Sequence, residues 1–266
     1  MSYSICSFNI LRSNRGDEKD RDFYGFLNAL VRKENIVIFA FQEAKNIYIV
    51  NNMVKNLVPL GKWEGGYVHN SELPFIWRTD RVKECSQNNT PTLVNYSSKV
   101  RFTREPVVAR FVPVDFNLNI EFRFINVHLH HGGDDSVDNL EKRMFECDMA
   151  KGMIYQRVNR PAWGSSGLFN RVFTAVLGDY NLNCESCNTC GYENIKTFQE
   201  ADTTLKKKDP GYSKSFDHFS YDAVKNASVP KHPPYRIDAV NDYFCGDWVR
   251  YREQVSDHVP IKLEIH

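Results

Sequence analysis

Short runs rich in Val, Ile and Phe alternate with a few stretches of helical periodicity along the whole chain. Ile36–Phe41 is an uninterrupted apolar run, which is typical of a strand buried on both faces. Asp20–Arg32 and Asp138–Val158 instead carry apolar residues at helical spacing. No Pro- or Gly-rich linker and no internal repeat divides the sequence. The pattern therefore predicts one domain of the α/β (α+β) class over residues 1–266.

The other predicted elements follow the same two patterns. Tyr48–Leu57 has helical spacing. After Tyr192 the sequence is polar, and we expect it to be rich in loops as far as about Pro234. Further strands are predicted at Ser4–Leu11, Leu73–Arg78, Arg81–Cys85, Pro106–Val114, Ile120–Leu129, Val172–Leu177, Arg236–Phe244 and Val259–Ile265.

Composition excludes several classes of protein. A hydrophobic content of 42% and a charged content of 25% exclude wholesale disorder. The balance of 34 Lys and Arg against 33 Asp and Glu argues against a protein that coats nucleic acid by bulk attraction. No apolar run reaches the ~18 residues of a membrane span, and the first residues lack the pattern of a signal peptide. We expect a monomer in the cytoplasm or nucleus, with secretion left open if the chain is a mature form.

Six short polar motifs lie within or directly beside predicted strands. Strand ends in a layered fold meet at one edge, so we expect these motifs to converge. They supply oxygen ligands for a hard divalent cation, two histidines, and carboxylates that could orient the histidines. This set of groups fits metal-assisted cleavage of a phosphate ester. The motifs are Ser7–Asn9, Gln42–Glu43, Asn126–His128, Gly178–Asn181, Arg236–Asp238 and Ser256–His258.

The order of these motifs resembles that of the endonuclease/exonuclease/phosphatase superfamily, from Ser4 to Ile265. Within it the chain is most similar to deoxyribonuclease I, through Gln42–Lys45, Phe75–Val82 and Phe102–Val108. The resemblance implies a four-layer sandwich of two packed, mostly antiparallel β-sheets flanked by helices. It also implies a Mg²⁺-dependent phosphodiesterase, with DNA as the leading substrate and endonuclease cleavage of little sequence preference as the leading activity. Mn²⁺ or Ca²⁺ could replace Mg²⁺.

The resemblance implies a metal site around Glu43, the principal Mg²⁺ ligand, with Asn9 and Asp257 assisting. Mg²⁺ keeps several waters and needs few carboxylates, so one Glu and one Asp suffice. A catalytically inactive binding protein on the same fold is the alternative from another functional class. The presence of the metal carboxylates and of both histidines argues against that alternative.

The implied catalytic centre contains two histidines. His128 and His258 would act as general acid and base, which suits imidazole because it titrates near neutrality. Asp238 would orient His258, and Glu72 would orient His128, since a carboxylate partner fixes the tautomer. Asp179 would position or deprotonate the attacking water.

The substrate would be held by a small polar and basic set. Asn181 would hold a phosphate oxygen as part of the catalytic centre, and Arg104 would contact a backbone phosphate. Lys45 stands where the family places a basic residue that contacts DNA, and Arg101 adds positive charge. These basic residues do not distinguish a nucleic acid from an inositol phosphate. RNA, a phosphoinositide or another phosphate ester therefore stays an alternative substrate.

A Cys-x-x-Cys-x-x-Cys cluster stands apart from these motifs. Cys184, Cys187 and Cys190 could hold zinc, but a closed site needs a fourth ligand. A local disulfide and ordinary loop cysteines are the other two interpretations, and the sequence leaves all three open.

Overall fold

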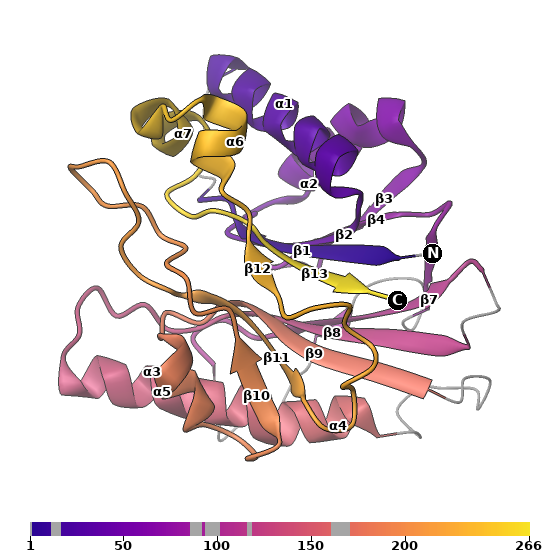
Figure 1. Cartoon of the computed structure of the whole chain (residues 1–266), viewed down its shortest axis with the longest axis vertical. Helices are drawn as coiled ribbons and strands as arrows, with labels where there is room; N and C mark the ends of the chain where they lie inside the picture. Colours follow the sequence, from indigo (N-terminus) through magenta and orange to yellow (C-terminus); the bar gives the residue numbers. More distant parts are fainter. Residues whose placement is uncertain (1, 12–16, 86–91, 94–101, 116–118, 161–170) are drawn as a thin grey trace.

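Two β-sheets lie face to face in the computed structural model, and their strands come from all parts of the sequence (Figure 1). The first sheet has the strand order β12-β13-β1-β2-β4-β3, and the second has the order β10-β11-β9-β8-β7-β5, with β6 also paired to β7. The first sheet contains β1 (Tyr3–Asn9), β2 (Ile36–Gln42), β3 (Trp63–Gly66), β4 (Phe75–Arg78), β12 (Tyr235–Arg236) and β13 (Ile261–Ile265). The second contains β5 (Val82–Glu84), β6 (Thr92–Leu93), β7 (Val107–Pro113), β8 (Ile120–His128), β9 (Arg171–Asp179), β10 (Ile195–Phe198) and β11 (Asp217–Asp222). The structure describes residues 2–11, 17–85, 92–93, 102–115, 119–160 and 171–266.

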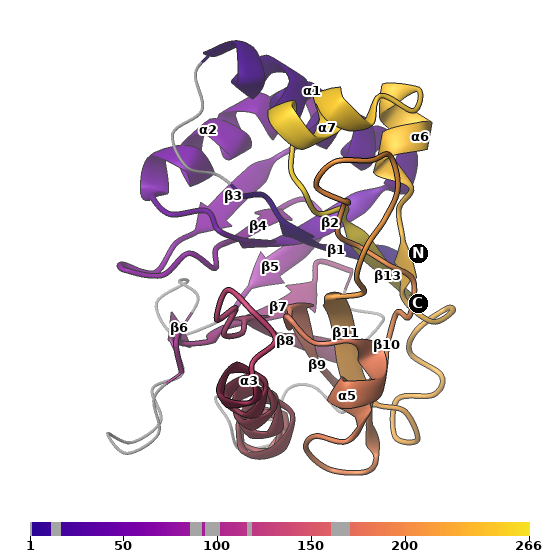
Figure 2. The same ribbon diagram turned by 90° about the vertical axis from the view of Figure 1, so that its left-hand side faces the viewer.

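Helices cover the outer face of each sheet, so the predicted four-layer sandwich is confirmed (Figure 2). The described helices include none with the length and apolar character needed to cross a bilayer. The first sheet is covered by α1 (Asp17–Glu34), α2 (Ile47–Leu57), the short 3₁₀ helix η1 (Val58–Leu60), α6 (Ala239–Phe244) and α7 (Trp248–Gln254). The second is covered by α3 (Val137–Met149), the π-helical turn η4 (Ala150–Ile154), α4 (Tyr155–Asn159) and α5 (Cys184–Asn188).

The strand pairing is antiparallel throughout, except for one parallel pair in each sheet. In the first sheet β1 runs parallel to β2, which sets Asn9 opposite Gln42. In the second sheet β8 runs parallel to β9, which sets His128 opposite Asp179. Because parallel strands end at the same edge, each pair brings its polar C-terminal residues together. The mostly antiparallel prediction is therefore confirmed.

The apolar runs arise because the central strands are covered on both faces. In β2 the side chains of Val37, Ile38 and Ala40 join the core between the sheets, whereas Phe39 and Phe41 face the helices. Side chains point to opposite faces along a strand, so an element between two cores needs apolar residues at every position. All seven residues of β2 are buried, as its sequence predicts.

One prediction about the last third of the chain is wrong, and another is incomplete. Arg236–Phe244 is not a strand: β12 ends at Arg236 and α6 follows, burying Ala239, Val240 and Phe244 on one face. The polar region from Tyr192 to Pro234 is rich in loops as predicted, but it also contributes β10 and β11 to the second sheet. Polar residues occupy β11 because its buried side chains find hydrogen-bond partners, as Ser220 does with Tyr180 at 2.9 Å.

The cysteine cluster lies on and just after α5, packed against the second sheet and α3. Cys184, Cys187 and Cys190 are buried free thiols. The Cys184 thiol donates to the Thr197 carbonyl oxygen at 3.2 Å. None of the three belongs to a group of potential metal ligands in the described part of the chain. Of the three interpretations, ordinary packed cysteines agree best with this geometry.

Candidate active site

The polar residues at the strand ends meet where the two sheets come together. Asn9 ends β1, Glu43 follows β2, and Asp179 ends β9. The Asn9 side-chain amide donates to Glu43 Oε1 at 3.3 Å and to Asp179 Oδ2 at 3.0 Å. Asn9 therefore links carboxylates that follow strands of different sheets, and it fixes them at the centre of the site.

Two histidines present the same ring nitrogen to one carboxylate oxygen. The Nε2 atoms of His128 and His258 each lie 3.7 Å from Asp179 Oδ2. The Nδ1 atom of each ring faces a second carboxylate. His128 Nδ1 is 2.6 Å from Glu72 Oε1, and His258 Nδ1 is 2.8 Å from Asp217 Oδ2. A carboxylate accepts a hydrogen bond, so both rings carry a proton on Nδ1 and turn Nε2 toward Asp179.

Asp217, which the sequence interpretation missed, replaces Asp238 as the partner of His258. Asp238 instead accepts hydrogen bonds from the Tyr212 hydroxyl and the Asn241 amide, and no interaction in the described residues joins it to His258. Asp217 begins β11 and lies opposite Asp179 in the sheet. The available signal was the alternation of apolar and polar residues in Phe219–Asp222, two residues after Asp217.

Burial and neighbouring charges shift the pKa values of three of these groups. Burial lowers the pKa of His258, but Asp217 and Asp179 outweigh that effect and raise it to about 10. Burial raises the pKa of Asp179, but the two histidines hold it below the ordinary value. Burial opposes ionisation of Glu72 too, and its hydrogen bond to His128 still lowers its pKa.

Two sets of residues could hold a metal ion. Asp179, Asp217 and His258 offer ligand atoms that all lie within 4.8 Å of one another. In the described structure Asp257 Oδ1 is buried without a hydrogen-bond partner, and Glu43 has a left-handed backbone with φ 64°. Strained backbone and unpartnered buried oxygens are common where a ligand is held. Oxygen donors suit Mg²⁺, so both observations fit Glu43 and Asp257 as ligands.

Two residues predicted to hold phosphate, Arg104 and Asn181, are both hydrogen-bonded to Leu129, the residue after β8. Arg104 Nη1 donates to the Leu129 carbonyl oxygen at 3.3 Å, and Asn181 Nδ2 donates to the same oxygen at 3.0 Å. Arg104 also forms a 2.6 Å ion pair with Glu72, and Lys45 lines the same cavity of about 580 Å³. Arg101, the other predicted basic residue, lies outside the described residues.

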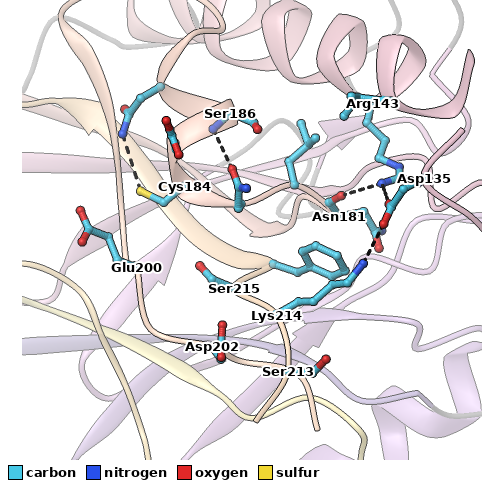
Figure 3. A pocket seen from close by; sticks show the side chains of 16 residues that line it. Asp135, Arg143, Asn181, Cys184, Ser186, Glu200, Asp202, Ser213, Lys214 and Ser215 are labelled. Carbon is cyan, nitrogen blue, oxygen red and sulfur yellow. Dashed lines mark hydrogen bonds and ion pairs between the residues drawn. The ribbon is translucent and has the colours of Figure 1, made fainter. Parts of the chain in front are cut away.

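Asn181 is held by residues that the sequence did not assign. His131 Nδ1 donates to Asn181 Oδ1 at 3.0 Å. Arg143 donates to the Asn181 carbonyl oxygen at 3.4 Å and to Asp135 at 2.8 Å, as Figure 3 shows. Asn181 has a positive φ of 50°, and these contacts stabilise that conformation. The orientation of its amide is therefore fixed by the loop after β8 and by α3.

Three solved structures have a fold similar to this one over nearly their whole length. TDP2 of D. rerio, complexed with a single-stranded DNA product, is 16% identical with a TM-score of 0.66, over 100% of this chain and 99% of that chain. An endonuclease/exonuclease/phosphatase family protein from Bacteroides thetaiotaomicron is 17% identical with a TM-score of 0.62, over 100% and 97%. This chain has the deoxyribonuclease I-like fold of the endonuclease/exonuclease/phosphatase superfamily.

The third structure extends the range of activities found on this superfamily fold. It is a mannosyl-6-phosphatase of Bacteroides thetaiotaomicron, 17% identical with a TM-score of 0.61, over 99% of each chain. No family model and no curated protein matches the sequence. At these identities the similarity establishes the superfamily fold, and the choice of reaction depends on the geometry of the site.

Proposed function

We propose that this chain is a divalent-metal-dependent phosphodiesterase that acts on DNA. The observation that carries the proposal is the pair of imidazoles that face one carboxylate oxygen, each 3.7 Å from Asp179 Oδ2. Each imidazole has its own carboxylate, Glu72 or Asp217, at Nδ1. A phosphate ester needs a general base for water and a proton donor for the leaving oxygen, and this arrangement offers both.

The proposed roles follow from the positions of the side chains. Asp179 orients the attacking water and takes up its proton, while His258 donates a proton to the leaving oxygen. His128 and the Asn181 amide stabilise the charge on the other phosphate oxygens. Glu43, with Asn9 and Asp257, would hold the metal ion, which when bound neutralises charge on the phosphate.

DNA is the favoured substrate because of the basic side chains near Glu72. Lys45 and Arg104 line one cavity with Glu105 and with Glu72, which is hydrogen-bonded to His128, so a phosphate next to the scissile one would have two cations within the same cavity. A structural neighbour, TDP2 of D. rerio, was crystallised with a single-stranded DNA product. The mannosyl-6-phosphatase neighbour favours a sugar phosphate as the second candidate substrate. Cleavage of interior bonds, as in an endonuclease, stays a prediction.

The test uses a labelled single-stranded oligonucleotide and mannose 6-phosphate, each with Mg²⁺ and with a chelator. We expect oligonucleotide cleavage that requires Mg²⁺ and falls at least about 100-fold in His258→Ala. His232→Ala is the matched control, because His232 forms its ion pair with Glu264 and contacts no residue of the site. Release of phosphate from the sugar alone would replace the proposal by the second candidate.

A further inference from the structure

A cavity of about 950 Å³ is lined by Asn181, and Arg104 is not among its lining residues (Figure 3). Its walls come from the loop after β8, from α3 and α5, and from the segment that precedes β11. Asn181 receives its position from Asp179, whose Oδ1 accepts the Asn181 N–H at 2.9 Å. The cavity therefore adjoins the proposed catalytic centre through Asn181. The volume lies in the range that holds a nucleoside-sized group, roughly 300–1,000 Å³.

The lining combines an apolar part with neutral hydrogen-bonding groups. Leu140, Leu182 and Phe216 contribute apolar surface, and a half-buried aromatic ring is a surface on which a base can stack. Amides and hydroxyls suit the base edges and sugar hydroxyls of a nucleoside. These neutral polar residues are Asn183, Ser186, Asn188, Ser213 and Ser215.

The charges of this cavity disfavour a phosphate. Its two cations are already paired, since Arg143 and Lys214 bind opposite oxygens of Asp135 at 2.8 and 3.0 Å. Three further carboxylates are exposed, and no ion pair in the described structure includes them. Figure 3 shows two of them, at positions 200 and 202, on the other side of the cavity from Asp135. The three are Glu185, Glu200 and Asp202.

The cavity that Arg104 lines is less acidic. Its two cations, Lys45 and Arg104, are matched by the two carboxylates Glu72 and Glu105, and Arg104 is paired with Glu72. The cavity beside Asn181 has four carboxylates against two cations. The phosphates of a DNA strand are therefore disfavoured in the cavity beside Asn181 relative to the cavity that Arg104 lines.

We propose that the cavity beside Asn181 is a subsite for the terminal nucleoside of a DNA strand whose end carries no phosphate. The subsite rests on the proposed phosphodiesterase function and narrows its substrate. The nucleoside joined to the scissile phosphate fills the cavity, and a further phosphate would lie against Glu185, Glu200 and Asp202. The protein therefore cuts the last phosphodiester of a strand in preference to interior ones, against the endonuclease prediction.

The test compares three single-stranded DNA substrates of one sequence, each with Mg²⁺. One is linear with a hydroxyl at both ends, one is linear with a phosphate at both ends, and one is a closed circle. Two unit charges ~10 Å apart in water change an equilibrium roughly twofold, and a terminal phosphate carries nearly two negative charges, so three carboxylates predict a preference of at least about tenfold for hydroxyl ends. We expect release of a terminal nucleoside from the first substrate, slower release of a terminal nucleotide from the second, and an intact circle.

A triple variant tests the three carboxylates directly. Glu185→Gln, Glu200→Gln and Asp202→Asn together should reduce the preference for hydroxyl ends to about twofold. A control triple variant makes the same change of charge at exposed positions outside both cavities, with Glu64→Gln, Glu193→Gln and Asp242→Asn. This control should retain the full preference for hydroxyl ends.

Each outcome supports or overturns the subsite. Equal cleavage of all three substrates by the natural sequence overturns the subsite and leaves the phosphodiesterase function standing. Cleavage of none overturns the phosphodiesterase function and the subsite with it. A preference for hydroxyl ends that survives the cavity triple, or disappears in the control triple, also overturns the subsite.

Discussion

Replacing Asp217 by Asn tests the corrected partner of His258. Asp217 Oδ2 lies 2.8 Å from His258 Nδ1, and the Asp217 side chain is fully buried. Asn keeps the size of the side chain but removes its charge, so it no longer favours an imidazolium. Asp238→Asn makes the same chemical change at the residue that the sequence favoured.

The magnitude follows from the hydrogen bond that is weakened. A hydrogen bond to a charged group contributes about 1.5–3 kcal/mol, and about 1.4 kcal/mol corresponds to a tenfold change in rate. Asp217→Asn should therefore lower kcat by about 10- to 150-fold. Asp238 accepts hydrogen bonds from Tyr212 and Asn241 on its two different oxygens, so Asp238→Asn loses one of them. No interaction in the described residues joins Asp238 to His258, so the variant should change kcat less than about threefold.

The assay is steady-state cleavage of a single-stranded oligonucleotide with saturating Mg²⁺, together with thermal unfolding of each variant. Unfolding identifies any loss of activity that reflects a smaller folded fraction. A kcat for Asp217→Asn within threefold of the natural protein would refute the assignment of Asp217. A larger loss in Asp238→Asn than in Asp217→Asn would restore the sequence prediction.

Three further changes test the metal site and the fold. Glu43→Gln should lower Mg²⁺-dependent activity about 100-fold or more without changing the melting temperature by more than a few degrees. Gly178→Ala should destabilise the fold by about 2–4 kcal/mol in urea unfolding, because φ is 139° and a Cβ would lie 2.0 Å from a backbone oxygen of β8. Glu121 is buried between Arg110 and Arg123, so Glu121→Gln should cost about 3–5 kcal/mol by the same measurement. Burial opposes ionisation of Glu121, but the two guanidinium groups lower its pKa. The ionised carboxylate should therefore stabilise the fold fully above about pH 5, and this contribution should disappear as the pH falls through the lowered pKa. Acid unfolding measures this loss.

The sandwich itself was implied by the resemblance, whereas its strands could be predicted from the residues. β2 lies between two cores and is an uninterrupted apolar run, and in β8 the apolar residues Ile120, Phe122 and Phe124 alternate with polar ones. β11 could not be found in this way. It places Asp217, His218 and Ser220 in the interior, where hydrogen bonds replace apolar packing, so its sequence has the composition of a loop. A buried strand that carries polar side chains is therefore hidden from a search for apolar runs.

The candidate site, like the strands, was predicted only in part. The resemblance paired Glu72 with His128, and the contact between them is present at 2.6 Å. The resemblance also paired Asp238 with His258 through the motif Arg236–Asp238, and it did not include Asp217. The pairing of β11 with β9 decides between the two aspartates, because it sets Asp217 opposite Asp179. That contact spans a sequence separation that no local pattern encodes.

The near-equal numbers of basic and acidic residues do not imply an even distribution of charge around the site. Lys45 and Arg104 line one cavity together with Glu72 and Glu105, whereas the cavity beside Asn181 has four carboxylates and two cations. A net charge of +1 therefore coexists with an excess of negative charge in one cavity. An evenly basic surface would hold DNA in any register and retain the product. The uneven charge instead favours one register, with phosphates in the cavity that Arg104 lines, and it repels a product phosphate that moves toward the carboxylates.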